Sequence, residues 1–367
     1  MSWLALNHRR GADGLGGGEP GSPGPSGTVG PTYRGPAECC RRGCSSRGLR
    51  KSESCVDDAK WQCLTRPTRA IHIALGQVIL IVCSLAHRDR TVTKSTWVWR
   101  YLSLIGVEQE APGLDGLRRL VRAHVHKVPF ENSASLLRRH EAGAGPVPRL
   151  DPETLLVSWE AGRAGGVCFE HTEMFGRLLV ELGYVVSPIA GEISFPGSHQ
   201  ALLVDLGGAR WLVDVGNGAP FFEPFPLDRQ FEIQRVGLGY RFNVDPNDPS
   251  VWIQERALEG GWKPYCRYLL RPQSTVDRET AYQRHHLPRD TWVTNSIVLI
   301  RSREEEVLVF RNMDQHRYTP NGKVSVRVED PEGWARLPGL LGLPALPVLE
   351  VVRAWTAINS QPLPKGI

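Results

Sequence analysis

Residues 163–171 read Arg-Ala-Gly-Gly-Val-Cys-Phe-Glu-His, so that two glycines run directly into a cysteine. Beyond Cys168, apolar residues recur at helical spacing until Gly183, which predicts a helix that begins at the cysteine. In that first turn the helix dipole and unpaired backbone N–H groups favour a thiolate. The glycines let backbone or a ligand approach closely, which makes Gly166 a candidate substrate contact. For this segment alone, the alternative is a small buried cysteine that fills a tight turn.

A nucleophilic cysteine needs a base and a group that orients the base, and a hairpin downstream offers both. Residues 198–206 and 209–216 have the pattern of two strands joined by Gly207-Gly208. With a two-residue loop, counting outward places His199 and Asp214 on one face as a diagonal pair, with backbones about 7–8 Å apart. A slip of one residue would put them on opposite faces.

Taken separately, His199 could be a solvated histidine at a strand end and Asp214 could close a turn. Together with Cys168 they form a set with defined roles. We predict that Cys168 is the nucleophile, that His199 accepts its proton, and that Asp214 holds the imidazole tautomer.

Three ordered motifs resemble those of the arylamine N-acetyltransferases. Residues 165–170, Gly-Gly-Val-Cys-Phe-Glu, match the middle of that family's nucleophile motif. Residues 213–218, Val-Asp-Val-Gly-Asn-Gly, stand where the family has Val-Asp-x-Gly-Phe-Gly, and residues 128–132, Val-Pro-Phe-Glu-Asn, match a family segment without a gap. The resemblance covers about residues 98–367.

The resemblance implies acetyl transfer from acetyl-coenzyme A to an aromatic amine, hydrazine or related amine, by a ping-pong route through an acetyl-cysteine. It implies an α+β fold with a helical N-terminal bundle, an antiparallel β-barrel and an α/β lid, and a Cys-His-Asp triad arranged as in cysteine proteases. The expected boundaries are 1–95 for a leader that is disordered or the product of a mistaken gene prediction, 96–182 for the helical domain with the nucleophile, 183–290 for the barrel with His and Asp, and 291–367 for the lid. Acetyl-CoA is expected as co-substrate, and no metal.

One departure from the family's motif concerns a buried charge. Ala164 occupies the position where the family has an arginine. The resemblance implies that this arginine pairs with a glutamate, which is Glu131 here. Unless Arg163 reaches over, Glu131 is expected to lack its counter-charge, and a half-broken buried pair is costly.

Other departures concern the acceptor. The family places Phe130 near the acceptor, which makes it a predicted substrate contact. Asn217 replaces a phenylalanine that is expected to line the acceptor pocket, so Asn217 is predicted there too. Thr172 replaces an asparagine four residues after the cysteine.

Charge and cysteines are concentrated in the first 95 residues of this 367-residue chain. The net charge is +5, but that segment carries fourteen Lys/Arg and seven Asp/Glu, so the remainder is slightly acidic and predicts no nucleic-acid partner. Six of the eight cysteines also lie there, which leaves Cys168 and Cys266 in the expected domain. That is no disulfide framework, and a cytoplasmic location is expected. The apolar run 71–86 is shorter than the about twenty residues of a spanning helix, so no membrane partner is expected.

Helices are expected up to residue 182 and short strands from residue 185 onward. Residues 114–126 predict a helix, and its histidines His124 and His126, like His140, are expected to be surface or helix-end residues without metal spacing. Residues 292–301 and 306–310 predict a hairpin, followed by helix over 331–352.

Two other functions remain open from the sequence. One is a papain- or transglutaminase-like cysteine hydrolase, against which residues 129–132 argue. The other is a catalytically impaired relative that acts as a binding module, for which the departures at Ala164, Thr172 and Asn217 would be the signature.

Overall fold

The computed structural model describes residues 96–360. The predicted leader, including the apolar run 71–86, lies outside the described residues, as do residues 361–367. Within the described part, no helix combines the length and the apolar character needed to cross a membrane.

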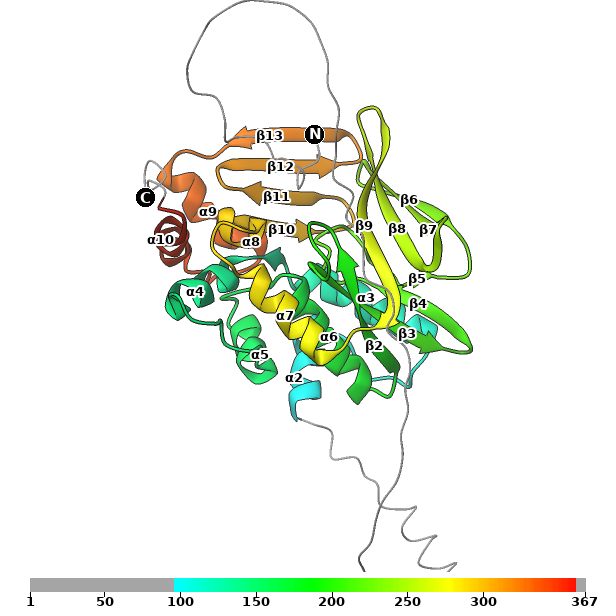
Figure 1. Ribbon diagram of the computed structural model, residues 1–367. Coiled ribbons are helices and arrows are strands. Elements are labelled where there is room, and N and C mark those ends of the chain that lie inside the picture. The colour runs from blue at the N-terminus through cyan, green and yellow to red at the C-terminus, as the bar shows by residue number, and fades with distance from the viewer. Residues whose placement is uncertain (1–95, 361–367) are drawn as a thin grey trace, which may run out of the picture. The chain divides into compact units, whose positions relative to one another are not determined.

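Helices dominate the segment before residue 182, as predicted (Figure 1). They are α2 (Thr96–Ile105), α3 (Leu114–Lys127), α4 (Ser133–Ala142), α5 (Pro152–Glu160) and α6 (Cys168–Glu181), with the short strand β1 (Phe130–Glu131) between α3 and α4. The helix predicted over residues 114–126 is present as α3, and its apolar residues Leu117, Leu120 and Val121 are buried. α6 begins at Cys168 as predicted, and Gly183 follows its end with φ of +90°.

The next strands form one antiparallel eight-stranded sheet in the order β5-β4-β3-β2-β9-β8-β7-β6. They are β2 (Val185–Glu192), β3 (His199–Leu206), β4 (Ala209–Val213), β5 (Phe225–Pro226), β6 (Phe231–Arg235), β7 (Leu238–Asp245), β8 (Asp248–Leu258) and β9 (Gly261–Pro272). The sheet curls so far that its two edge strands approach each other. The ring of Phe225 on β5 stacks on that of Phe231 on β6, with centroids 5.4 Å apart. The two edge strands do not pair with each other, so the predicted barrel is a half-barrel.

β3 lies between two apolar cores. Leu202 and Val204 face the helices and join the core of α2, α3, α5 and α6. Ala201 and Leu203 face the inside of the curl and join its core. β3 is therefore buried on both faces. His199 is its first residue, at the end that lies next to the first turn of α6.

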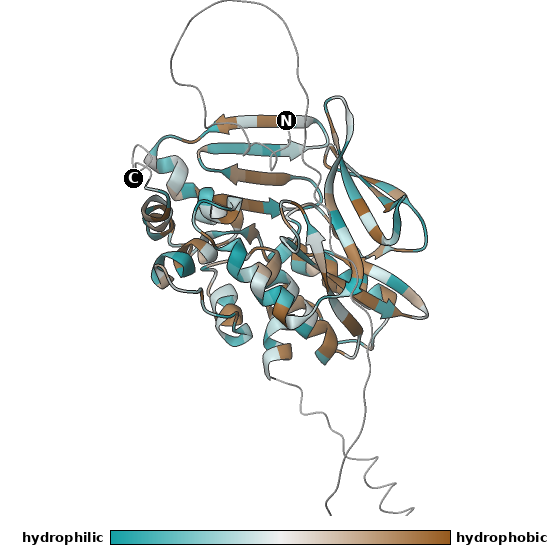
Figure 2. Ribbon diagram, viewed as in Figure 1, coloured by the Kyte–Doolittle hydropathy of each residue, from teal (hydrophilic) through white to brown (hydrophobic). Residues whose placement is uncertain are grey.

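A second sheet has the order β1-β10-β11-β12-β13. Its later strands are β10 (Val298–Ser302), β11 (Val307–Arg311), β12 (Asp314–Thr319) and β13 (Gly322–Arg327), and the helices of this part are α7 (Thr275–His285), α8 (Trp292–Asn295), α9 (Pro331–Leu341) and α10 (Val348–Asn359). β11 is apolar almost throughout and buried on both faces (Figure 2). β1 pairs with β10 through Phe130 and Ile300, which brings the helical segment against the C-terminal sheet.

Some expectations for this part were wrong. Residues 292–295 are helical, whereas a strand was predicted from Trp292. β12 and β13 were not predicted, although Val324 and Val326 alternate with polar residues along β13; both valines are exposed, so this strand buries no apolar face. α9 and α10 are separate helices, whereas one helical stretch was predicted over 331–352.

Candidate active site

The first turn of α6 holds Cys168 in a closely packed position. The carboxylate of Glu170 accepts the backbone N–H of Val167 at 3.1 Å, which caps the helix next to the cysteine. Gly216, in the loop after β4, approaches so closely that a Cβ there would lie 2.7 Å from Cα of Cys168. Cys168 is 2% exposed. The predicted start of the helix is confirmed, and so is the close backbone approach at the glycine pair, because a Cβ at Gly165 would collide with the Pro129 carbonyl oxygen.

The hairpin of β3 and β4 has the predicted register. Leu206 pairs with Ala209 and Leu202 with Val213, so Asp214 follows directly after the paired residues. Nε2 of His199 lies 2.8 Å from Oδ2 of Asp214, and both side chains are buried. The parity argument from the sequence is therefore confirmed.

The His199 ring also interacts with the Cys168 thiol. Burial by itself would lower the pKa of His199, but the charge and the hydrogen bond of Asp214, together with a hydrogen bond to the Cys168 thiol, raise it to about 10. Because Nε2 faces Asp214, Nδ1 is the nitrogen left for the sulfur.

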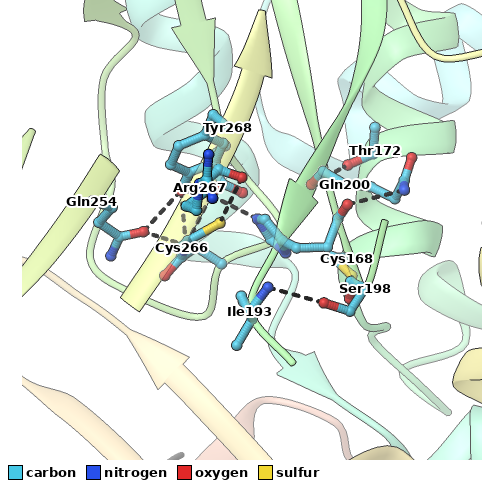
Figure 3. A network of polar contacts seen from close by, with 12 residues as sticks. Cys168, Thr172, Ile193, Ser198, Gln200, Gln254, Cys266, Arg267 and Tyr268 are labelled. Atoms are coloured by element: carbon cyan, nitrogen blue, oxygen red, sulfur yellow. Dashed lines mark hydrogen bonds and ion pairs between the residues drawn. The ribbon is translucent and has the colours of Figure 1, made fainter. Parts of the chain in front are cut away.

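Ser198, beside Cys168, orders the connection between β2 and β3 (Figure 3). Its hydroxyl accepts the backbone N–H groups of Ile193, Ser194 and Phe195 at 2.9–3.3 Å. Its carbonyl oxygen lies 4.0 Å from Sγ of Cys168. This tight turn keeps the start of β3, and with it His199, next to α6.

Sequence reasoning missed the polar groups behind Asp214. Oδ2 of Asp214 accepts the hydroxyl of Tyr268 at 2.7 Å and the amide Nδ2 of Asn217 at 2.8 Å. Oε1 of Gln254 lies 2.8 Å from the Tyr268 hydroxyl oxygen and accepts Nδ2 of Asn217 at 3.2 Å. Tyr268 and Gln254 come from β9 and β8, and nothing in the sequence marks them, because the burial of Gln254 is known only from the fold.

Asn217 is buried among these groups. Its amide nitrogen is directed at Asp214 and its amide oxygen accepts Nη2 of Arg256 at 3.3 Å. The structure therefore places Asn217 against the carboxylate of Asp214.

Glu131 lacks an arginine from the glycine loop, as expected, because Arg163 is exposed. The carboxylate instead accepts the backbone N–H groups of Gly165 at 2.7 Å and Ser133 at 2.5 Å. Burial raises the pKa of Glu131, against the opposing effect of these hydrogen bonds. A mostly buried guanidinium from α4, that of Arg138, forms an ion pair with Glu170 and lies near enough to Glu131 for their charges to attract.

Phe130 and Gly166 lie side by side and form an isolated parallel bridge. The Phe130 ring stacks on His171 and on Trp292, with centroids 6.2 and 5.8 Å away. A Cβ on Gly166 would lie 2.6 Å from Cβ of Glu170, so only glycine fits there.

His124 lies in the last turn of α3, as expected for a helix-end histidine, but it is fully buried rather than on the surface. Its Nδ1 lies 2.8 Å from the Tyr101 hydroxyl and its Nε2 lies 2.7 Å from Nδ1 of His171, whose Nε2 in turn lies 3.1 Å from the Gly166 carbonyl oxygen. His126 is partly buried and His140 is exposed. No group of metal-ligating side chains of the usual kind is present within residues 96–360.

Comparison with known proteins identifies the family. A family model described as N-acetyltransferase matches residues 113–335. The arylamine N-acetyltransferase of Mycolicibacterium smegmatis is 30% identical over 233 residues, which cover 59% of this chain and 81% of the relative. The chain belongs to the arylamine N-acetyltransferase family. Membership of this family identifies the protein as an acetyltransferase and supports acetyl transfer to arylamines as its reaction.

Solved arylamine N-acetyltransferases share the fold. The enzyme from Mycobacterium abscessus superposes with a TM-score of 0.63 at 23% identity, covering 72% of this chain and 95% of that one. The Mycobacterium marinum enzyme, solved in complex with CoA, superposes with a TM-score of 0.61 at 22% identity, covering 71% and 99%.

The departures from the arylamine N-acetyltransferase motifs all have local partners. The Thr172 hydroxyl donates to the backbone carbonyl of Gln200 at 3.1 Å and so links α6 to β3 next to His199. Ala164 is buried. The positive charge that an arginine at this position would provide is supplied near Glu131 by Arg138. Asn217 is bound to Asp214, so all three departures are accommodated by the groups around Cys168.

Proposed function

We propose that the protein transfers an acetyl group from acetyl-CoA to an aromatic amine, hydrazine or related amine through an acetyl-Cys168 intermediate. The observation that supports this most directly is the interaction of Cys168 with His199, whose Nε2 lies 2.8 Å from Asp214. The CoA complex of the Mycobacterium marinum relative supports a coenzyme A thioester as the donor.

In the first half-reaction His199 takes the thiol proton, and the Cys168 thiolate attacks the thioester carbonyl. The C–S bond to coenzyme A breaks, and the departing thiolate receives the proton from His199. Exchange of one thioester for another costs little free energy, which makes sulfur a suitable nucleophile. Asp214 stabilises the imidazolium and holds its orientation, with Tyr268 and Asn217 fixing the carboxylate.

In the second half-reaction the amine nitrogen attacks the acetyl-Cys168 carbonyl. Neutral His199 accepts the proton that the amine loses, and the Cys168 thiolate leaves, which regenerates the thiolate–imidazolium pair for the next attack on acetyl-CoA. Burial of Cys168 limits competing hydrolysis, because water reaches the thioester poorly.

The substrate contacts proposed from the sequence have different supports. Phe130 presents its ring between His171 and Trp292 and remains a proposed contact of the acceptor. Gly166 is proposed to act by allowing close backbone approach beside Cys168. For Asn217, the contact with Asp214 supports a role in holding the catalytic carboxylate.

The test is stoichiometric acetylation. Purified protein mixed with acetyl-CoA should release free coenzyme A in a burst equal to the enzyme concentration, and intact-mass spectrometry should find one acetyl adduct. Cys168→Ala should abolish both. Cys266→Ala removes the other buried thiol of residues 96–360 and is the matched control, which should retain them. A full burst in Cys168→Ala, or cleavage of casein without reaction with acetyl-CoA, would overturn the proposal.

A further inference from the structure

His285, the last residue of α7, has a buried imidazole without hydrogen-bond partners among the described residues. The residue is 1% exposed, and neither Nδ1 nor Nε2 is bonded within residues 96–360. Its backbone carbonyl, by contrast, accepts the Thr291 hydroxyl at 2.6 Å. An unpaired buried polar group costs free energy, about 1–3 kcal/mol for an ordinary donor or acceptor. Such a group therefore calls for an explanation.

Three aromatic rings surround this imidazole at edge-to-face angles. The centroids of Phe169, Trp292 and Phe195 lie 5.3, 5.8 and 6.2 Å from that of His285. Each ring adjoins the candidate active site from a different element. Phe169 follows Cys168 in the chain, and Trp292 stacks on Phe130.

Phe195 belongs to the turn closed by Ser198, whose backbone N–H donates to the Phe195 carbonyl at 3.0 Å. His285 is also close enough to His199 for their positive forms to repel. Burial, with the charges of His286 and His199, keeps the pKa of His285 well below its usual range. The ring is therefore neutral and offers one N–H donor and one nitrogen acceptor.

His286, the next residue, provides a contrast. Its Nδ1 donates to the Tyr282 carbonyl at 2.8 Å, and its ring packs on that of Tyr282 with centroids 4.5 Å apart. This hydrogen bond to the preceding helical turn accounts for the orientation of the His286 ring. No such bond within the described part of the chain holds the His285 ring, so its orientation follows from packing among the three aromatic rings.

We infer that His285 determines acceptor specificity: its imidazole hydrogen-bonds an uncharged polar substituent of the aromatic amine, while Phe169, Phe195 and Trp292 contact the aromatic ring. This inference rests on the proposed function. The suitable substituents are those that a neutral imidazole satisfies, such as a hydroxyl, a carboxamide or the carbonyl of a hydrazide.

The same chemistry disfavours an acceptor that carries a carboxylate. A carboxylate brought against a neutral buried imidazole loses its hydration, and the nearby His199 is already paired with Asp214. The nearest cation on this helix, Arg284, packs over the Phe195 ring at 4.2 Å, but its side chain is half exposed and lies 3.8 Å from Asp290. We therefore expect 4-aminobenzamide to be a better acceptor than 4-aminobenzoate.

The test compares size-matched acceptors in wild-type protein and in His285→Leu. The readout is the ratio of kcat/KM for hydroxyanilines to kcat/KM for methylanilines, measured for the 3- and 4-substituted isomers. The ratio cancels any general loss of active protein. We expect it to fall at least about fivefold in His285→Leu, as the loss of one hydrogen bond to a buried group implies. The fall should come chiefly through KM for the hydroxylated acceptor.

Two further variants separate recognition from packing. His285→Asn keeps a donor and an acceptor and should retain more of the ratio than His285→Leu. His286→Gln is the matched control in the neighbouring position and should leave the ratio unchanged. The melting temperature of His285→Leu should equal or exceed that of the wild type, because no hydrogen bond is lost in the free protein. An unchanged ratio in His285→Leu, or the same change in His286→Gln, would overturn the inference.

The acetyl-enzyme measurement keeps this inference apart from the function on which it rests. If acetyl-CoA gives no Cys168 adduct in the wild type, the proposed function has failed. If the adduct forms and amines are acetylated, but the ratio does not depend on residue 285, only the inference has failed.

Discussion

His124 and His171 hold their ring nitrogens 2.7 Å apart beneath the first turn of α6. The carbonyl oxygen of Gly166 can only accept, so Nε2 of His171 carries its proton and Nδ1 of His171 accepts from His124. Nδ1 of His124 then accepts from the Tyr101 hydroxyl. The chain of hydrogen bonds therefore runs in one direction, from Tyr101 to the glycine loop that precedes Cys168. Both rings are neutral, and the loop is fixed from below.

Removing the hydroxyl at the start of this chain should destabilise the protein. Tyr101→Phe leaves Nδ1 of His124 without a donor in a fully buried site. We expect the free energy of unfolding to fall by about 1–3 kcal/mol. Thermal unfolding measures the loss. The same deletion on β12, Tyr318→Phe, is the control, and an equal effect of both variants would contradict a special role for Tyr101.

Stability should fall as the pH is lowered from about 6.5 toward 4. Burial lowers the pKa of His171 to about 4, against the opposing effect of its hydrogen bonds to backbone carbonyls, whereas an unfolded histidine titrates near 6.5. Between these values the unfolded state binds more protons, so protonation favours unfolding by up to about 1.4 kcal/mol per pH unit. Burial keeps the pKa of His124 well below its usual range and adds to the effect.

His199 has the opposite sign, because its pKa is raised to about 10 by Asp214 despite burial. Its contribution is complete below pH 6.5 and is lost only as the pH rises toward 10, so it does not offset the loss in acid. Urea unfolding at pH 7 and pH 5 is the measurement. We expect a loss of at least about 1 kcal/mol at pH 5, and an unfolding free energy independent of pH in this range would refute the assignment of neutral buried histidines.

The ion pair between Arg138 and Glu170 should be needed for stability. Arg138→Gln leaves the buried Glu170 carboxylate without a cation, which costs about 3–5 kcal/mol in comparable buried pairs. Because Glu170 also caps the N–H of Val167, the burst of coenzyme A should slow as well. Arg118→Gln, which removes an exposed i,i+3 pair with Asp115, should unfold like the wild type. Equal stability of the two variants would show that Glu170 does not depend on Arg138.

Loss of the Asp214 carboxylate should affect activity more than folding. Asp214→Asn removes the charge that raises the pKa of His199 and allows the wrong imidazole tautomer. We expect kcat/KM for acetyl transfer to fall at least about a hundredfold. Asp205→Asn, an exposed position on β3, the strand that begins with His199, is the control. A loss of less than about threefold would argue against an orienting role.

The space beside the His199 ring should accept only glycine. A Cβ at Gly191 would lie 2.9 Å from Cδ2 of His199 and 3.1 Å from Sγ of Cys266, so Gly191→Ala must displace the imidazole. A shift of that size should reduce the rate of acetyl-Cys168 formation at least about tenfold. Gly339→Ala meets nothing within 4 Å and should be neutral. Stopped-flow measurement of the burst distinguishes the two, and an unchanged rate in Gly191→Ala would contradict the prediction.

The sequence predicted the parts of the site that depend on local geometry. Glycines before Cys168 and helical spacing after it predicted where α6 begins. The two-residue Gly-Gly loop predicted which residues of β3 and β4 share a face, and therefore the contact between His199 and Asp214. These inferences succeed because helix and strand periods are set by the backbone over a few residues.

Other features required the whole fold. Tyr268 reaches Asp214 from β9 and Gln254 contacts Tyr268 from β8, and no spacing in the sequence relates these residues to residue 214. His124 looked like a helix-end histidine, yet the packing of α3 on α6 buries it against His171. The sheet curls without closing into a barrel, and its edge strands contact each other through aromatic side chains.

The sequence by itself determined the identity and order of the proposed reacting groups, a thiol at a helix start followed by imidazole and carboxylate in one hairpin register. Only the tertiary structure decided what surrounds them: the donors that hold Asp214, the cation that pairs with Glu170, and the placement of the His285 imidazole among three rings. The physical reason is that backbone periodicity acts over neighbouring residues. Burial and hydrogen-bond partners instead depend on elements that meet only when the chain has folded.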